Sequence, residues 1–168
     1  MSAATLLSVD SLSVSYTSRG VERPAVHAVS FNVAPGETLA VVGESGSGKS
    51  TIAQSIIGLL PHGGNVTSGS IHLGDPASGP DLLRLPESGL RPIRGRRIGL
   101  IPQDPASSLN PVRTIGWSVA EALRIHRRGD ATSRSRLVIE LLERVGIDDP
   151  ARRAAQYPHQ LSGGQRQR

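Results

Sequence analysis

The segment with the clearest chemistry is the loop at residues 43–50, which reads Gly-Glu-Ser-Gly-Ser-Gly-Lys-Ser. Its glycines allow backbone N–H groups to curl around phosphate oxygens, and Lys49 adds a compact ammonium that can reach the terminal phosphates of a nucleotide. Ser50 offers a hydroxyl to the Mg²⁺ that accompanies such a nucleotide. The spacing therefore predicts a phosphate-binding loop. We expect nucleotide contacts from Gly43, Glu44, Ser45, Gly46, Ser47, Gly48, Lys49, Ser50 and Thr51, with Lys49 also catalytic and Ser50 a metal ligand.

The type of cation in this loop is itself informative. Lys49 is the only lysine among the 19 lysine and arginine residues of the chain. A lysine kept at this one position suggests that arginine cannot serve there. A planar guanidinium is bulkier than an ammonium and would not fit in the same way inside a closed ring of amides.

The segments on either side of the loop favour the same interpretation. Residues 37–42 form a short apolar run that predicts a buried strand. After Ser50, apolar residues recur at helical spacing until Pro61 and the two glycines at 63 and 64 end the pattern. A helix that begins there would point its N-terminal amides at the phosphates. The alternative, a Gly/Ser-rich turn that matches the motif by chance, does not account for these flanks.

Composition limits the possible classes of protein. The 168 residues amount to about one domain, without a long apolar run or a signal-peptide pattern at the N-terminus. The absence of cysteine excludes disulfides, a thiolate metal site and a cysteine nucleophile. A net charge of +5 would suit a nucleic-acid partner, but aromatic residues make up only 2% of the chain and leave little for base stacking. We therefore expect no nucleic-acid partner.

Periodicity along the chain predicts a mixed α/β architecture. Strands are expected at residues 6–16, 26–33, 37–42, 68–73 and 98–101, of which the first two alternate as in an antiparallel layer. Residues 74–96 are rich in Gly, Pro, Ser and Arg and are expected to form a surface excursion. Helical spacing follows the loop and recurs at 115–127 and 133–145. The sequence thus predicts a nucleotide-binding core at residues 1–105 and a helical subdomain at residues 106–168.

The last eight residues, 161–168, read Leu-Ser-Gly-Gly-Gln-Arg-Gln-Arg. Together with the phosphate loop and Gln103, this string resembles the signature of the ATP-binding cassette (ABC) family of ATPases. A serine followed by two glycines at the start of a helix offers a second set of amides suited to an anion, although a simple helix cap would have the same pattern. The resemblance implies that the signature closes over the γ-phosphate of ATP held by a partner subunit, through Ser162, Gly163, Gly164 and Gln165.

Two further positions match the family one residue at a time. Tyr16 corresponds to the aromatic residue that stacks on adenine, and its alternative is an ordinary strand tyrosine. Gln103 corresponds to the glutamine that senses Mg²⁺ and the attacking water, which would make it a catalytic residue and a metal ligand. The alternative for Gln103 is a plain polar turn. The family fold is an α/β P-loop NTPase core of ABC type with an antiparallel β subdomain and an α-helical subdomain.

Within the family, two strings resemble the dipeptide, oligopeptide and nickel importers: residues 102–111, with Pro105 and Ser107 among them, and Tyr-Pro-His-Gln at 157–160. The resemblance implies an ATP-binding subunit that couples ATP binding and hydrolysis, with Mg²⁺, to uptake of a peptide or related small solute. Its implied partners are integral-membrane permease subunits, a second ABC ATPase subunit and, indirectly, a solute-binding protein. Its implied location is the cytoplasmic face of the cell membrane, as a peripheral protein.

The resemblance also implies two catalytic elements after the signature, an apolar strand that ends in Asp-Glu and a histidine switch. Neither occurs within these residues, which end with the signature itself. His159 cannot be the switch, because it precedes the signature. We therefore expect a fragment or a truncated product that lacks the C-terminal part of the core. On this expectation the 168 residues alone bind ATP poorly and do not hydrolyse it, whereas the intact protein does.

Two other functions stay open as alternatives. One is a truncated, non-hydrolysing ABC module that competes for the permease or for nucleotide, and the other is a non-transport ABC ATPase. The histidines at 27, 62, 72 and 126 have no ligand spacing, so no metal site is expected from them. Trp117 could pack in the helical subdomain or contact a permease.

Overall fold

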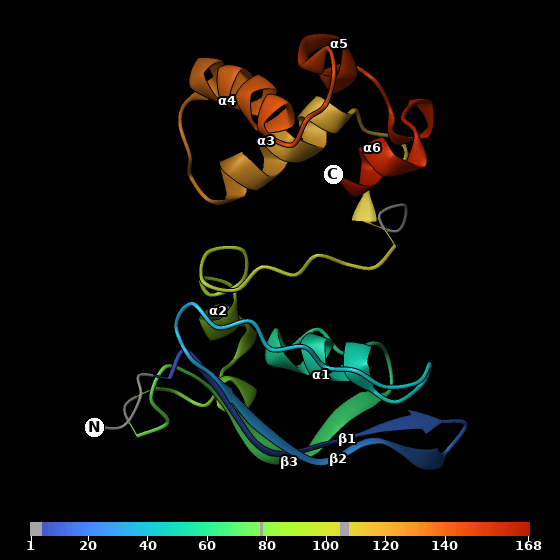
Figure 1. The fold of residues 1–168 in the computed structure, drawn as a ribbon, viewed down its shortest axis with the longest axis vertical. Coiled ribbons are helices and arrows are strands. Elements are labelled where there is room, and N and C mark those ends of the chain that lie inside the picture. Colours follow the sequence, from blue (N-terminus) through green and yellow to red (C-terminus); the bar gives the residue numbers. More distant parts are fainter. Residues whose placement is uncertain (1–4, 78, 105–107) are drawn as a thin grey trace. The chain divides into compact units, whose positions relative to one another are not determined.

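The computed structural model describes residues 5–77, 79–104 and 108–168. The chain divides into two compact units, residues 1–100 and residues 101–168 (Figure 1). Pro105 and Ser107 of the importer-like string lie outside the described residues. In the part of the chain that the structure describes, no helix combines the length and the apolar character needed to cross a bilayer.

Three antiparallel strands form the sheet of the first unit: β1 (Leu7–Ser18), β2 (Val21–Val33) and β3 (Gly64–Leu73). β1 is central, because the strand order is β2-β1-β3 (Figure 1). Arg19 and Gly20 connect β1 to β2, and both have positive φ angles, of 51° and 77°. Such two-residue turns match the right-handed twist of a hairpin. The predicted antiparallel layer is confirmed.

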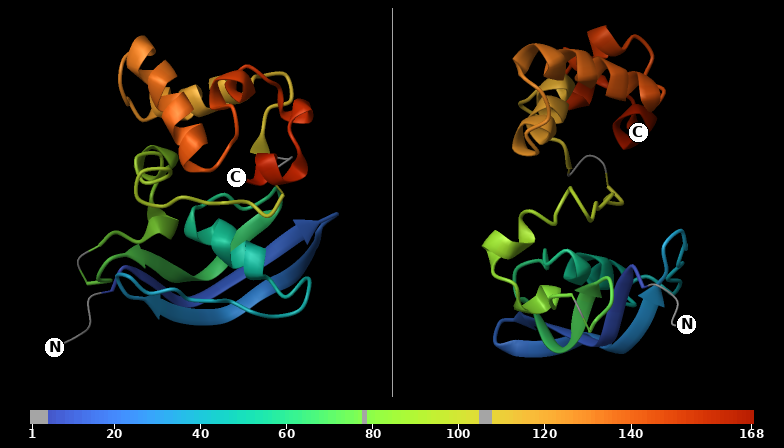
Figure 2. Two further views of the ribbon diagram at one scale, coloured as in Figure 1. Left: turned by 45° about the horizontal axis from the view of Figure 1, so that its top comes forward. Right: turned by 90° about the vertical axis from the view of Figure 1, so that its left-hand side faces the viewer.

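Helix α1 (Lys49–Ile56) covers one face of this sheet, as Figure 2 shows. Ile52 packs into a core of residues from the three strands and from the segment after β3, which are Val9, Leu12, Val14, Val26, Ile71 and Leu82. Burying apolar side chains of this size contributes about 1.5–3 kcal/mol each. The predicted helix after the loop is confirmed, and its packing holds the loop at one end of the sheet.

The excursion at residues 74–96 contains two short helical turns, η1 (Leu82–Arg84) and α2 (Glu87–Leu90). Asp81 anchors the first of them, because one carboxylate oxygen accepts hydrogen bonds from the amides of Ile71 and Leu83, each at 3.0 Å. Leu82 is thereby turned into the core, where it is 4% exposed. The excursion is therefore bonded to β3, and its Leu82 belongs to the same core as Ile52 of α1.

Two predicted strands are wrong in this structure. Residues 37–42 and 98–101 form no strand, and the second run has only an isolated bridge from Ile98 to Arg94. The side chains of Val42 and Ile101 are 88% and 91% exposed. An extended segment becomes a strand only when a neighbour takes its backbone hydrogen bonds, and no described strand lies beside either run. The burial that their apolar composition predicted is therefore not found at Val42 or Ile101.

The second unit is helical: α3 (Ile115–Ile125), α4 (Ala131–Arg144), α5 (Pro150–Ala154), η3 (Pro158–Gln160) and α6 (Gly163–Gln167). The two predicted long helices are confirmed as α3 and α4. Their apolar faces form a separate core with the segments that follow, made of Ile115, Val138, Leu142, Ile147 and Leu161.

Both long helices are capped at the N-terminus by the side chain of the residue before them. Thr114 Oγ1 accepts a hydrogen bond from the Trp117 amide at 3.2 Å, and Asp130 does the same for the Ser133 amide at 2.8 Å. The Ser133 backbone and side-chain donors hold the pKa of the Asp130 carboxyl below its usual value. These N-caps explain why α3 and α4 begin where they do. The Arg113 guanidinium lies over the Trp117 ring, with its Cζ atom 4.5 Å from the ring centre.

Helix α1 begins at a glycine for a steric reason. Gly48 has φ 90°, a left-handed conformation, and a Cβ added there would lie 2.5 Å from the Ala25 carbonyl oxygen of β2. Gly46 also has positive φ, at 85°, but a Cβ there would meet nothing within 4 Å. Both positions favour glycine, and only the first also needs the space that glycine leaves.

We therefore expect Gly48→Ala to lower the free energy of unfolding more than Gly46→Ala. The left-handed backbone alone costs about 1–2 kcal/mol, and overpacking against β2 adds about 1–3 kcal/mol at Gly48. Urea unfolding followed by circular dichroism would measure both variants. Equal losses for the two would contradict the close approach of Gly48 to the sheet.

Candidate functional site

The ammonium of Lys49 lies folded over the loop that precedes it. Its Nζ donates hydrogen bonds to the carbonyl oxygens of Gly43 at 2.9 Å and Glu44 at 2.6 Å, and to Ser47 Oγ at 3.3 Å. Gly43 and Ser47 also approach each other, since a Cβ added at Gly43 would lie 2.7 Å from Ser47 Oγ. The loop therefore closes on itself with one positive charge at its opening.

The amides of the loop are available to a ligand. Gly48 is the N-cap residue of α1 and supplies no side-chain cap. Within the described residues, nothing accepts a hydrogen bond from the amides of Gly46, Gly48, Lys49 or Ser50. Unpaired amides at a helix N-terminus, together with the positive end of the helix dipole, favour an anion. The loop thus has the donors and the charge that a phosphate group requires.

Tyr16 comes close to this helix from the sheet. Its hydroxyl lies 3.4 Å from Thr51 Oγ1 in the first turn of α1. Gly64 on β3 makes room for the ring, because a Cβ at Gly64 would lie 2.8 Å from the Tyr16 Cε1 atom. Tyr16 and Thr51 are therefore brought together, with Thr51 buried and Tyr16 half-buried.

The remaining predicted residues of the loop are at the surface. The side chains of Glu44, Ser45 and Ser50 are exposed, and Ser50 directly follows Lys49 at the start of α1. Its hydroxyl is an oxygen donor of the kind that Mg²⁺ accepts, so the residue present fits the predicted metal role. Gln103 is also exposed but belongs to the second unit, and the structure does not place it relative to the loop. Across the described ranges no three His, Cys, Asp or Glu side chains form a metal cluster.

The signature residues form a capped helix start. Ser162 Oγ accepts a hydrogen bond from the Gln165 amide at 3.2 Å, and Gln165 Oε1 accepts one from the Ser162 amide at 3.0 Å. This reciprocal pair is a capping box. Gly163 and Gly164 are exposed, and a Cβ on either would meet nothing within 4 Å. The serine and glutamine therefore define where α6 begins, while the two glycines leave its first amides uncovered.

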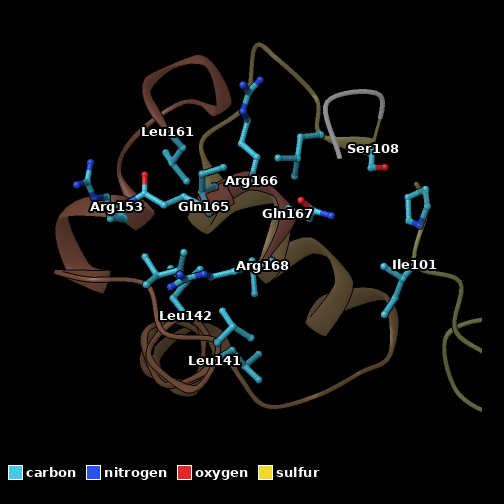
Figure 3. Close-up of a pocket in the computed structure, with 16 residues that line it drawn as sticks. Ile101, Ser108, Leu141, Leu142, Arg153, Leu161, Gln165, Arg166, Gln167 and Arg168 are labelled. Atoms are coloured by element: carbon cyan, nitrogen blue, oxygen red, sulfur yellow. The ribbon is translucent and has the colours of Figure 1, made fainter. Parts of the chain in front are cut away.

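A cavity of about 330 Å³ lies inside the second unit, behind the signature (Figure 3). Leu142 and Leu161 contribute to an apolar lining, and Arg153 and Arg166 border it. The Nε atoms of these two arginines are buried and have no partner among the described residues. No pattern in the sequence predicted this arrangement, because the burial of Arg153 and Arg166 depends on how α5 and α6 pack.

Comparison with known proteins agrees with this geometry. The family model described as ABC transporter matches residues 26–168. The chain is 47% identical to the dipeptide transport ATP-binding protein DppD of Bacillus subtilis, over 97% of this chain and 48% of that protein. It is 46% identical to the oligopeptide transport ATP-binding protein OppD of Mycobacterium bovis, over 97% of this chain and 26% of that one. The chain thus spans about half the length of the Bacillus relative.

A solved structure has the same fold. It is a dimeric ATP-binding cassette in a post-hydrolysis state, bound to ADP and Pi, and it superposes with a TM-score of 0.78 at 27% identity. The superposition covers 95% of this chain and 65% of that one. The fold predicted for residues 1–168 is therefore confirmed, and the chain belongs to the ABC transporter family.

Proposed function

We propose that this chain is the nucleotide-binding part of an ATPase subunit that couples ATP binding and hydrolysis to import of peptides or related small solutes. The observation that carries the proposal is the loop at the start of α1, where free amides and the Lys49 ammonium surround one opening. Such an arrangement suits the triphosphate of a nucleotide. The names of the Bacillus and Mycobacterium relatives support peptide import.

In this proposal the loop residues divide the work of holding ATP. The free amides of Gly46, Gly48, Lys49 and Ser50 bind the phosphates, and the Lys49 ammonium moves from the loop carbonyls to the terminal phosphates. Ser50 would hold Mg²⁺, which neutralises phosphate charge when bound. The short distance from Tyr16 to Thr51 supports a position for the tyrosine beside the nucleotide. Glu44, Gly43, Ser45 and Ser47 shape the loop around these groups.

The signature would act on a second copy of the site. We propose that residues 1–105 form the nucleotide-binding core and that residues 106–168 carry Ser162, Gly163, Gly164 and Gln165 to the γ-phosphate held by a second ATPase subunit. The uncovered first amides of α6 support this role, and so does the dimeric state of the related cassette. Gln103 would connect the nucleotide to the permease, as the family resemblance implies.

The transport role belongs to the whole protein, because the chain spans 48% of the Bacillus relative. We propose that the whole protein lies at the cytoplasmic face of the membrane, on permease subunits that receive solute from a binding protein. Purified full-length protein tests the ATPase directly. ATP hydrolysis that requires magnesium supports the proposal. ATP binding without hydrolysis favours a non-hydrolysing module, and the absence of both refutes the proposal.

Lys49→Arg should weaken ATP binding by the full-length protein in the presence of magnesium. The guanidinium keeps the charge but is too large for the ring of carbonyl and hydroxyl oxygens at 2.6–3.3 Å around the ammonium. Loss of one charge-assisted contact corresponds to about 10- to 100-fold in affinity. Isothermal titration would measure it, with Arg84→Lys, at an 87% exposed side chain, as the matched control. Equal affinities for the wild type and Lys49→Arg would contradict the assigned role of Lys49.

Ser162→Asp separates the capping role of the serine from its proposed role in the dimer. Aspartate is as good an N-cap as serine, so α6 should remain folded, but its carboxylate would face the partner's phosphate. We expect nearly normal ATP affinity with ATP-driven dimer formation weakened at least about tenfold. Thr114→Asp makes the same change at the N-cap of α3 and should leave dimer formation unchanged. Analytical ultracentrifugation with ATP would measure this, and unimpaired dimers of Ser162→Asp would count against the signature role.

A further inference from the structure

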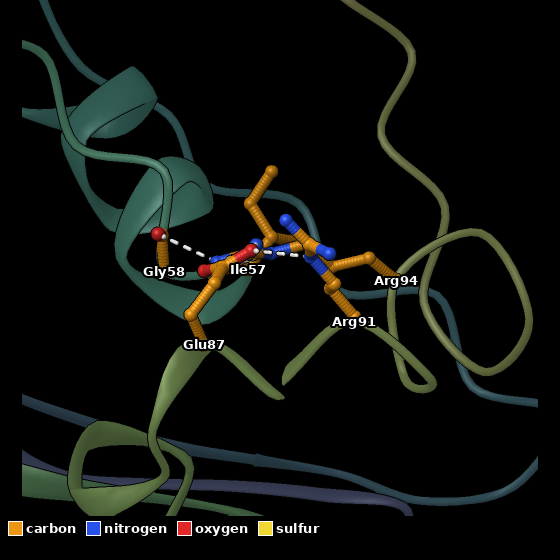
Figure 4. Close-up of polar contacts among 5 residues, drawn as sticks. All are labelled: Ile57, Gly58, Glu87, Arg91 and Arg94. Carbon is orange, nitrogen blue, oxygen red and sulfur yellow. Dashed lines mark hydrogen bonds and ion pairs between the residues drawn. The ribbon is translucent and has the colours of Figure 1, made fainter. Parts of the chain in front are cut away.

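Arg94, which lies outside the phosphate loop, holds the C-terminal end of helix α1. The helix ends in a Schellman motif, in which the amides of Gly58 and Leu59 bond to the carbonyls of Ser55 and Gln54 at 3.0 Å and 2.9 Å. Two carbonyl oxygens just beyond the last helical residue remain for other donors. Arg94 takes both, with Nε on Ile57 O at 2.7 Å and Nη2 on Gly58 O at 2.9 Å (Figure 4).

The third nitrogen of the same guanidinium fixes its orientation. Arg94 Nη1 bonds to both carboxylate oxygens of Glu87, at 2.9 Å and 3.0 Å. The Arg94 side chain is 19% exposed, whereas Glu87 is 59% exposed and also contacts Arg91 at 3.5 Å. Arg94 is thus largely desolvated and uses every nitrogen, which makes it unlike the exposed arginines elsewhere in the first unit, such as Arg84 and Arg91.

This contact acts on the helix that carries the loop. α1 has only 8 residues, and a helix so short is marginal without support at its ends. Its N-terminal end has no side-chain cap, because those amides are left for a ligand. A cation at the C-terminal end interacts favourably with the helix dipole. It also ties the end of the helix to residues 87–94, because the same guanidinium binds Glu87.

We propose that Arg94 is a positioning residue for the phosphate loop: its guanidinium clasps the end of α1 and so holds the opposite end, with its free amides, in the geometry that binds the triphosphate. This inference rests on the proposed nucleotide function and extends it to a residue outside every motif. Arginine is needed because three donors must reach two carbonyls and a carboxylate in one plane. A lysine at 94 could serve only part of that set.

Gly58 gives the clasp its fit. Its φ of 64° ends the helix, and a Cβ there would lie 3.1 Å from Arg94 Nη2 and 3.0 Å from Leu90 Cδ1. Any larger residue would therefore press directly on the guanidinium. Gly58→Ala disturbs the clasp without removing its charge, and it provides a variant that is independent of any change at position 94.

The test compares Arg94→Gln, Arg94→Lys and Gly58→Ala with Arg91→Gln in the full-length protein. Arg91→Gln removes a neighbouring guanidinium that contacts the same Glu87 but, among the described contacts, neither carbonyl. Competition against a fluorescent ATP analogue gives the dissociation constants of ATP with magnesium and of adenosine, and thermal unfolding is recorded for each variant. Adenosine has no phosphates, so its affinity reports general loss of structure.

We expect Arg94→Gln to weaken ATP about five- to tenfold, as for a lost cation at a helix end, while adenosine affinity stays within about twofold. Arg94→Lys and Gly58→Ala should fall between Arg94→Gln and the control. If Arg94→Gln does not fold, the comparison of Arg94→Lys and Gly58→Ala with Arg91→Gln decides the question, and ATP affinities equal to the control overturn the proposal. Equal losses for ATP and adenosine also overturn it, in favour of a purely structural role.

The same data separate this inference from the function on which it rests. A wild-type protein without affinity for ATP refutes the proposed function and, with it, the role of Arg94. A wild-type protein that binds ATP, with Arg94→Gln binding it equally well, refutes the positioning role alone.

Discussion

The structure of the candidate site depends on one steric constraint, the contact between the start of α1 and strand β2. Gly48 is left-handed and lies so close to the Ala25 carbonyl that no side chain fits. The helix must therefore start without a side-chain cap, and its first amides remain unpaired. Lys49, the first helical residue, then folds back over the loop instead of extending into solvent. A contact that serves packing thus also creates an anion site.

The rest of the first unit holds this helix start in place. The buried face of α1 packs on β1, β2 and β3 through Ile52, and Tyr16 reaches its first turn from the sheet. Arg94 holds the other end. Cations of the two kinds serve different sites: the ammonium fits among loop oxygens, whereas the planar guanidinium of Arg94 bridges three acceptors. This division agrees with a chain that uses lysine once and arginine elsewhere.

Local patterns predicted much of this arrangement. The alternation in β1 and β2 and the helical spacing of α1, α3 and α4 correspond to elements in the structure. The phosphate-binding role of the glycine-rich loop at residues 43–50 stays a prediction. The strands predicted at residues 37–42 and 98–101 were wrong, because strand formation depends on a neighbouring strand that no local pattern encodes. Arg94 was missed for the same kind of reason, since the two carbonyl groups that it binds, on Ile57 and Gly58, lie 37 and 36 residues away in sequence. A simple helix cap was the alternative to an anion site at Ser162. The structure shows the cap, with Gln165 completing it, and leaves the first amides of α6 uncovered.

The central claim is that the amides at the start of α1 hold the phosphates of ATP. Nuclear magnetic resonance of the ¹⁵N-labelled full-length protein tests it most directly, by following backbone amide shifts as ATP with magnesium is added. The account predicts that the largest shifts occur at residues 45–50 and that adenosine does not reproduce them. Saturable ATP binding that leaves those amides unshifted would contradict the account.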